Sequence, residues 1–144
     1  MLIYLDCCCY NRPFDDLTQL RVRMEAEAVL AILRIVNEKN WTLVTSDVID
    51  LELSNMKNTI KRNKIDELCR LAYKRVLTTD SMAARADELQ KIGFKALDSF
   101  HLAIAEYSNV DVFLSTDDKL VSLANKVSLP VKVVNPLKWL SEVL

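Results

Sequence analysis

Short apolar runs alternate along the chain with longer segments in which apolar residues recur at helical spacing. A short run without polar alternation is typical of a strand that is buried on both faces. Such runs occupy residues 2–5, 41–45, 110–114 and 131–134, and a weaker candidate occupies residues 75–77. The pattern therefore predicts strands separated by helices.

Helical periodicity marks the segments between these runs. Ser46 stands at the N-cap position of one helix, where its hydroxyl can accept a hydrogen bond from a free amide, and Gly93 is a natural end for another. The predicted helices span residues 18–38, 46–57, 59–74, 81–92, 96–107, 117–125 and 137–143. In the longest, the apolar residues at helical spacing are Leu20, Met24, Ala28, Ala31 and Ile35.

Strands that alternate with helices predict an α/β fold, with a parallel sheet covered on both faces. We expect one domain over residues 1–144, because this length is ordinary for a single hydrophobic core. In such sheets the functional crevice lies beyond the carboxyl ends of the strands. This rule identifies which polar residues deserve scrutiny.

The charge balance excludes a globally basic nucleic-acid binder, because 19 Lys and Arg residues stand against 20 Asp and Glu residues. A local basic face remains open, since seven basic residues lie between Lys57 and Arg75 against only Asp66 and Glu67. That stretch is either a surface that follows phosphates or a solvated helix face. The single glycine, Gly93, excludes a Gly-rich phosphate loop.

No membrane span is expected, because no stretch reaches 18 apolar residues without a charge, and no signal peptide is expected, because Asp6 interrupts the only candidate apolar run near the N-terminus. The adjacent cysteines Cys7, Cys8 and Cys9 do not match zinc spacing and could bridge only with strain. Together with Cys69 they favour free thiols in a reducing cytoplasm. We interpret the triplet as small apolar residues after a buried strand, with a redox role as the alternative.

Four acidic residues lie where the crevice is expected. Asp6 directly follows the first strand, where a lone carboxylate loses hydration unless a cation or a helix N-terminus compensates. Asp117 follows the fourth strand and Asp98 lies in the first turn of its helix, so interaction with the helix dipole is an alternative for both. Glu52 lies at the edge of an apolar helix stripe, although surface solvation is the common fate of glutamate.

Taken together, the four acids predict a metal site, because carboxylate oxygens suit Mg²⁺ and Mn²⁺ and a cation relieves their mutual repulsion. Such a site suits phosphodiester hydrolysis, in which one ion can activate the attacking water and a second can neutralise the leaving oxygen. The number of ions stays open at this point.

Four motifs, in order, resemble the PIN-domain family over essentially the whole chain. They are Leu5-Asp6 with Asn11-Arg12-Pro13-Phe14-Asp15-Asp16, Thr45-Ser46 with Glu52, Lys95 to Ala105 around Asp98, and Phe113 to Leu120 around Asp117. The resemblance implies a PIN-like (Rossmann-like) three-layer α/β/α fold with a central, mainly parallel sheet of about five strands. It also implies an endoribonuclease that depends on Mg²⁺ or Mn²⁺.

Residue by residue, the resemblance implies that Asp6, Glu52, Asp98 and Asp117 form the catalytic, metal-binding quartet, with Asp118 as the alternate for the fourth place. Many small bacterial and archaeal members are toxins of VapBC-type pairs, which implies an RNA substrate, a cognate antitoxin and a homodimer. One departure concerns Cys7 and Cys8, which stand where the family often has Thr or Ser and then Asn. Thiols are poorer hydrogen-bond partners for metal-bound water.

Four further side chains are candidates for accessory roles. His101, one turn after Asp98, could hydrogen-bond that acid or assist the substrate, or it could be structural. Ser46 and Ser115 could orient the acids or metal-bound water, although helix capping explains each nearly as well. Asn11 belongs to the first motif of the resemblance.

Two rival functions are also compatible with the pattern. A non-catalytic PIN-like scaffold that binds RNA or protein would keep its function after Asp6→Ala. A phosphoacceptor receiver-like domain also carries acids at strand ends with Mg²⁺. That domain would need an acid pair near the first strand, a central acceptor Asp and a late Lys, which the single Asp6 fits poorly.

Overall fold

The computed structural model describes residues 1–72 and 74–144, and within them five strands form one parallel sheet. The strands lie in the order β3-β2-β1-β4-β5, and each neighbouring pair runs parallel. Their bounds are β1 (Leu2–Leu5), β2 (Thr42–Ser46), β3 (Lys74–Val76), β4 (Val112–Leu114) and β5 (Val133–Val134). The predicted α/β class and parallel sheet are confirmed.

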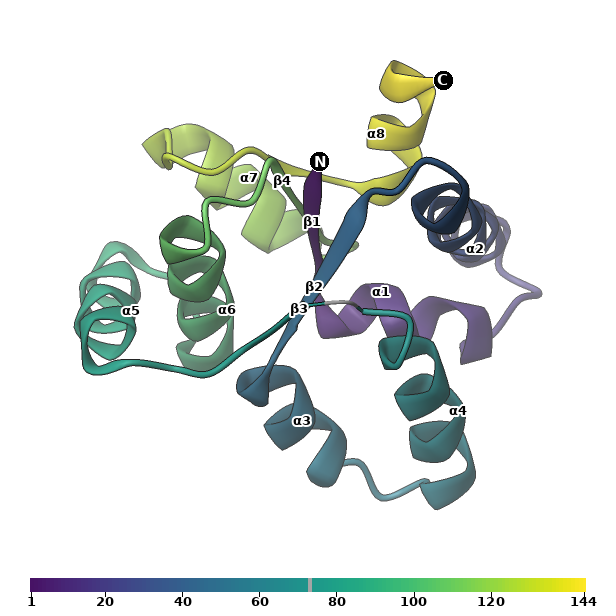
Figure 1. Ribbon diagram of the computed structural model, residues 1–144, viewed down its shortest axis with the longest axis horizontal. Coiled ribbons are helices and arrows are strands. Elements are labelled where there is room, and N and C mark those ends of the chain that lie inside the picture. Colours follow the sequence, from purple (N-terminus) through teal and green to yellow (C-terminus); the bar gives the residue numbers. More distant parts are fainter. Residues whose placement is uncertain (73) are drawn as a thin grey trace.

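Helices cover both sides of the sheet, with α5 and α6 on one side and α1, α2 and α4 on the other (Figure 1). The helices are α1 (Cys7–Asn11), α2 (Leu20–Glu38), α3 (Asp47–Ser54), α4 (Thr59–Cys69), α5 (Asp80–Ile92), α6 (Ala96–Tyr107), α7 (Asp118–Val127) and α8 (Pro136–Val143), and η1 (Arg12–Phe14) is a 3₁₀ turn. Within the described ranges, no helix combines the length and the apolar character needed to cross a membrane.

The strand order reverses beside β1, because the chain moves outward to β2 and β3 and then returns to the other side of β1 as β4. At such a reversal the segments after the two central strands turn to opposite faces and leave a crevice between them. Leu5 at the end of β1 pairs with Leu114 at the end of β4, and the Asp6 amide donates to the Leu114 carbonyl at 2.9 Å. The residues that follow β1 and β4 therefore meet at one edge of the sheet.

The two strands at this reversal are fixed by aromatic packing. The rings of Tyr4 and Phe113 stack with centroids 5.3 Å apart and planes within 8°. Both are fully buried, as are Ile32 on α2 and Leu102 on α6. Burying each large side chain of this kind is worth about 1.5–3 kcal/mol. The core therefore makes the position of β1 against β4 rigid.

The Cys7–Cys9 run belongs to a short helix that the sequence pattern did not reveal. Asp6 caps α1 by accepting a hydrogen bond from the Cys7 amide at 2.8 Å. Cys7 and Cys9 are buried in the core, which agrees with the interpretation of small apolar residues after a strand. The sequence pattern does not predict this helix, because five residues are too few to show helical periodicity.

Two helices end earlier in the structure than the sequence pattern predicts. The helix after Ser46 stops at Ser54 instead of residue 57, because the Asn55 amide turns back to the Glu52 carbonyl at 3.2 Å. The next helix ends at Cys69, not at residue 74, since Lys74 already belongs to β3. Tyr73, inside that predicted helix, lies outside the described residues. Ser46 and Gly93 act as the predicted N-cap and C-cap.

The predicted apolar stripe of α2 is only partly correct. Ala28 is buried, but Leu20 and Met24 are exposed. The buried face is shifted around the helix and is made of Glu25, Ala26, Ala28, Val29, Ile32, Leu33 and Val36. The periodicity of mixed apolar residues gave the helix correctly but could not decide which of two adjacent stripes meets the sheet.

A buried ion network ties α2 to its neighbours. Glu25 is only 1% exposed, and its carboxylate accepts from Arg12 Nε at 3.0 Å and from Asn135 Nδ2 at 2.6 Å. Arg21 Nε lies 3.6 Å away, and Arg12 also donates to Asp15 at 3.0 Å. A buried carboxylate is tolerated only when it is paired and hydrogen-bonded. The network therefore holds η1 and the start of α8 against α2.

Arg12→Ala should lower the free energy of unfolding by about 2–4 kcal/mol, because Glu25 would keep its buried charge without its main partner. Urea denaturation followed by circular dichroism measures this. Arg70→Ala is the matched control, since Arg70 pairs with Asp66 on the exposed face of α4. It should change stability by less than about 1 kcal/mol. Equal effects of the two variants would contradict a structural role for the Glu25 network.

Candidate metal centre

Asp6 occupies the end of β1, and neutral groups hold its carboxylate. It is only 5% exposed and accepts hydrogen bonds from the Cys7 amide and from Ser115 Oγ, each at 2.8 Å, and from Cys8 Sγ at 3.3 Å. Among the described residues, no Lys or Arg forms an ion pair with it. The sheet therefore presents a nearly buried carboxylate that is hydrogen-bonded but not neutralised.

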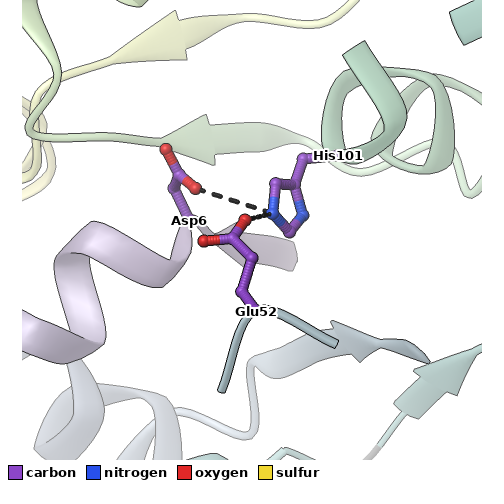
Figure 2. A group of neighbouring side chains, drawn as sticks. All are labelled: Asp6, Glu52 and His101. Atoms are coloured by element: carbon purple, nitrogen blue, oxygen red, sulfur yellow. Dashed lines mark hydrogen bonds and ion pairs between the residues drawn. The ribbon is translucent and has the colours of Figure 1, made fainter. Parts of the chain in front are cut away.

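Glu52 and His101 complete a tight group with Asp6 (Figure 2). Each of the three residues offers one possible ligand atom, and these atoms all lie within 4.8 Å of one another. His101 Nε2 contacts Glu52 Oε1 directly and lies 4.0 Å from Asp6 Oδ1. The group thus joins the end of β1, the last turn of α3 and the second turn of α6.

His101 does not bond Asp98, which was one sequence expectation, but bridges Glu52 and Tyr4. Its Nδ1 lies 2.6 Å from the Tyr4 hydroxyl, which lies 2.7 Å from Ser46 Oγ. Burial opposes a charge on this ring, but the Glu52 hydrogen bond and the charge of Asp6 outweigh burial and raise the pKa of His101. Tyr4 was predicted only as a strand residue. A tyrosine in a buried strand could have indicated a polar partner nearby, because its hydroxyl needs a hydrogen bond.

Asp98 is half-buried in the first turn of α6, outside the tight group but within reach of its charges. Burial, followed by the charges of Asp6 and Asp117, raises the pKa of Asp98 to about 6. A carboxyl shifted in this way reports a cluster of acids without enough positive charge nearby. Positive charge placed among these acids would lower the pKa of Asp98 again.

Asp117 and Asp118 have different surroundings at the start of α7. Asp117 caps the helix and accepts from the Lys119 and Leu120 amides at 3.0 and 3.3 Å. Asp118 points to the surface, where Arg21 binds it at 2.8 Å and holds the pKa of its carboxyl below the usual value. Only Asp117 lines the hollow beside the Asp6 segment, so this environment favours Asp117 over Asp118 for the fourth place.

Ser46, Ser115 and Asn11 all lie around the cluster. Ser46 caps α3 through the Ile49 amide at 3.4 Å, as predicted, and also contacts Tyr4. Ser115 Oγ donates to Asp6 and accepts from the Asp117 amide at 3.1 Å, so it links the segments after β1 and β4. Asn11 donates to the Cys7 carbonyl at 3.3 Å and lines the same hollow as Asp117.

This hollow has a volume of about 360 Å³ and opens beside the acids. Residues from α1, η1, α4 and the β4–α7 turn line it, namely Cys8, Asn11, Arg12, Asp15, Lys61, Thr116 and Asp117. Arg12 and Lys61 both bind Asp15, at 3.0 and 2.9 Å. The sequence did not indicate that Lys61 and Arg12 would meet, because they are far apart in the chain and joined only through Asp15.

The four cysteines are free thiols. Burial raises the pKa of Cys69 to about 12 and raises the pKa values of Cys7 and Cys9 above their ordinary value, so these three stay protonated. Cys8 is only partly buried, and its Sγ donates to Asp6 at 3.3 Å and accepts from the Thr116 amide at 3.4 Å. Cys8 therefore occupies, with a thiol, a position directly beside the candidate site.

The basic stretch between residues 57 and 75 is partly neutralised. Lys61 binds Asp15, Arg70 binds Asp66 and Arg75 binds Asp50. A second hollow of about 420 Å³ adjoins the first through Asp15 and Lys61, and it is also lined by Phe14 and Lys64. The basic residues thus reach the neighbourhood of the acids through α4, not as one continuous face.

The donor set suits a hard divalent cation. Asp6 and Glu52 supply carboxylate oxygens in the tight group, and the charges of Asp98 and Asp117 lie close enough to act on one another. Other acids of the chain, such as Glu25, Asp15 and Glu106, have Arg or Lys partners. Within the described residues, the only cation-forming partner of the four candidate acids is His101. Carboxylates in this state could hold a divalent metal ion.

Comparison with known proteins finds a matching family model and solved structures of the same fold. A family model described as PIN domain matches residues 20–126. FitAcB from Neisseria gonorrhoeae superposes with a TM-score of 0.62 at 19% identity, covering 93% of this chain and 97% of the other. No curated protein matches the sequence.

Two further crystal structures share the fold. VapBC2 from Rickettsia felis, bound to a promoter DNA fragment, gives a TM-score of 0.63 at 14% identity. VapBC-1 from nontypeable Haemophilus influenzae gives 0.57 at 14% identity. Each alignment covers 94% of this chain and 98% of the other.

Asp98→Asn should stabilise the metal-free protein at pH 7.5. The pKa of Asp98 is higher in the folded protein than in the unfolded chain, so its ionisation penalises folding, and the penalty grows as pH rises from about 4 to 6. Solvent screens part of this penalty at a half-buried group, so we expect about 1 kcal/mol at most. That corresponds to a Tm increase of roughly 2–4 °C.

The Asp98→Asn advantage should shrink as pH falls toward 4 and be lost below it, because Asp98 is then protonated in the unfolded chain as well as in the folded protein. Thermal melts in EDTA across this range measure it. Asp118→Asn is the control, because Arg21 lowers the pKa of Asp118 and its loss should not stabilise at any pH. An advantage of Asp98→Asn that is independent of pH would rule out charge repulsion as its cause.

Proposed function

Because this chain belongs to the PIN-domain family, we propose that it is an endoribonuclease dependent on Mg²⁺ or Mn²⁺. Its 144 residues act as one domain, and RNA phosphodiester bonds are the substrate. The single observation that carries the proposal is the state of the acids at the sheet reversal. Asp6 is nearly buried, and its charge and that of Asp117 help to raise the pKa of Asp98, with no Lys or Arg pairing among the described residues.

In this proposal Asp6 and Asp98 are the principal ligands, and Asp117 completes the metal site. Glu52 orients the attacking water or holds a second ion. When bound, the cation would supply a water of lowered pKa and positive charge for the developing phosphorane. The hydrogen bonds that Ser115 and the Cys7 amide donate to Asp6 keep its oxygens in place without neutralising them.

RNA would approach through the two adjoining hollows. Asn11, Arg12 and Lys61 line the hollow beside Asp117, and Phe14 and Lys64 line the next. Cationic side chains bind phosphate, and an aromatic ring offers a face for an unstacked base. The half-buried ion pairs of Asp15 with Arg12 and Lys61 would hold both cations in a fixed position.

The physiological role proposed here is that of a toxin in a VapBC-like toxin–antitoxin pair. Its partners would be a cognate antitoxin protein and a second copy of the chain, in the cytoplasm. The support is the fold shared with FitAcB and the two VapBC structures over more than 90% of each chain. A small antitoxin reading frame beside the gene would agree with this role.

Pure protein should cut a labelled, structured RNA pool with Mg²⁺ or Mn²⁺ and not with EDTA. Asp6→Asn should reduce the rate about 10²-fold or more, because it removes a charge on which ion binding depends. Gel electrophoresis of the RNA products measures both effects. Circular dichroism would confirm that the variant is folded.

Asp87→Asn is the matched control, because Asp87 is an exposed acid on α5 that pairs only with Lys91. It should cut RNA at the wild-type rate. If the folded wild-type protein binds RNA but cuts none with either ion, the nuclease proposal is wrong. The non-catalytic scaffold, which Cys8 beside Asp6 would favour, then takes its place.

A further inference from the structure

We propose that His101 is a positioning residue that holds Glu52 through a hydrogen bond from Nε2, and that Tyr4 and Ser46 fix the ring for this task. His101 is then not a metal ligand, although its Nε2 lies among the possible ligand atoms. The inference rests on the proposed function, because it assigns how one acid of that site is oriented.

Hydrogen bonds link Ser46, Tyr4, His101 and Glu52 in a chain, and solvent reaches only its last member, Glu52. Ser46, Tyr4 and His101 are each 0% exposed, whereas the Glu52 side chain is 24% exposed. The links are 2.7 Å from Ser46 to Tyr4 and 2.6 Å from Tyr4 to His101 Nδ1. Phe113 stacks on the Tyr4 ring, with centroids 5.3 Å apart, so the ring is packed within the core. The chain therefore starts in the rigid core and ends at the crevice.

The hydrogen positions follow from counting donors and acceptors. Ser46 Oγ already accepts from the Ile49 amide, so its own hydrogen is free to point to Tyr4. The Tyr4 hydrogen then points to His101 Nδ1, which leaves the ring hydrogen on Nε2, facing Glu52. In this direction each hydroxyl of the chain donates once and accepts once.

The opposite direction leaves groups unsatisfied. If Nδ1 carried the hydrogen, Tyr4 would donate to Ser46, whose own hydrogen would have no acceptor among the described residues. The bare Nε2 would also face the Glu52 carboxylate, lone pair against lone pair. Buried polar groups without partners cost about 1–3 kcal/mol each. A doubly protonated ring also donates from Nε2, so the assignment to Glu52 holds in either charge state.

A ligand role for His101 would need this unfavourable arrangement, because a nitrogen binds a cation only through its lone pair. It would also favour Mn²⁺ or other transition ions over Mg²⁺. With Nε2–H donated to Glu52, the centre keeps oxygen ligands alone. The acid keeps its charge, and its second oxygen takes no part in the hydrogen bond with His101.

His101 is the only histidine in the chain, so its ring nitrogens can be assigned in ¹⁵N NMR without ambiguity. In metal-free protein at pH 9, the spectrum should show hydrogen on Nε2, and this hydrogen should persist when the protein is saturated with Mg²⁺. In Glu52→Gln the Nε2 proton should move to lower frequency, because its acceptor loses the negative charge. A bare Nε2 in wild-type protein, before or after Mg²⁺, would overturn the inference.

Tyr4→Phe removes the donor to Nδ1 and should lower kcat for RNA about tenfold with little change in KM, as for other residues that orient a metal ligand. In the same variant the Nε2 proton should exchange faster with water, a signature that lost core packing alone does not give. Tyr10→Phe is the matched control, because Tyr10 is equally buried and its hydroxyl has no partner in the described structure. It should change neither kcat nor the ring spectrum.

Different results would contradict the proposed nuclease function and the positioning role of His101. If the proposed function is wrong, wild-type protein cuts no RNA whatever the ring spectrum shows. If the positioning role is wrong, the Nε2 hydrogen is missing, or Tyr4→Phe leaves proton exchange and kcat at the Tyr10→Phe values. His101→Gln, whose amide can still donate to Glu52, should retain more activity than His101→Ala at equal fold content, and equal losses would count against the role.

Discussion

The carboxylate of Asp6 is the constraint around which the rest of the site is arranged. It stands at the end of the central strand, almost out of solvent, where an ionised group needs compensation. The sheet supplies it with donors from two segments, the Cys7 amide after β1 and Ser115 after β4. Because Ser115 also accepts from the Asp117 amide, one hydrogen-bonded unit fixes the positions of two acids.

The buried and half-buried acids of the protein have two kinds of surroundings. Glu25 is neutralised by Arg12 and Arg21 and serves to hold helices together. Asp6 and Glu52 receive hydrogen bonds from neutral groups and from His101, and among the described residues no Arg or Lys pairs with them. The first arrangement is complete as it stands, whereas the second keeps negative charge that a cation can use.

Rigidity reaches the crevice through the core. The rings of Tyr4 on β1 and Phe113 on β4 stack, and the Tyr4 hydroxyl holds the His101 ring in place through a hydrogen bond. A site built on strand ends and supported by packed side chains is held more closely than one on loops. This support matters most for Glu52, because Glu52 lies in the last turn of α3, a short helix that ends at Ser54.

Much of this could be predicted from the sequence because the signals are local. Apolar runs and helical spacing predict the α/β class, and the rule of strand ends points to Asp6 and Asp117. Ser46 and Gly93 marked real helix ends, since capping depends only on neighbouring residues. The sequence pattern did not reveal the five-residue α1, because it is too short to show a repeating pattern, or the buried face of α2, because packing selects it.

The order of the principal strands and helices could therefore be predicted from the sequence, together with a candidate set of acids near the strand ends. Only the tertiary structure decided the partners: His101 contacts Glu52 instead of Asp98, Arg12 serves Glu25 as well as Asp15, and Arg21 takes Asp118 away from the cluster. Three of these pairs, His101–Glu52, Arg12–Glu25 and Arg21–Asp118, join residues that are 13 to 97 positions apart. Their contacts depend on strand order and helix rotation, which the core packing of the whole chain sets and no local pattern encodes.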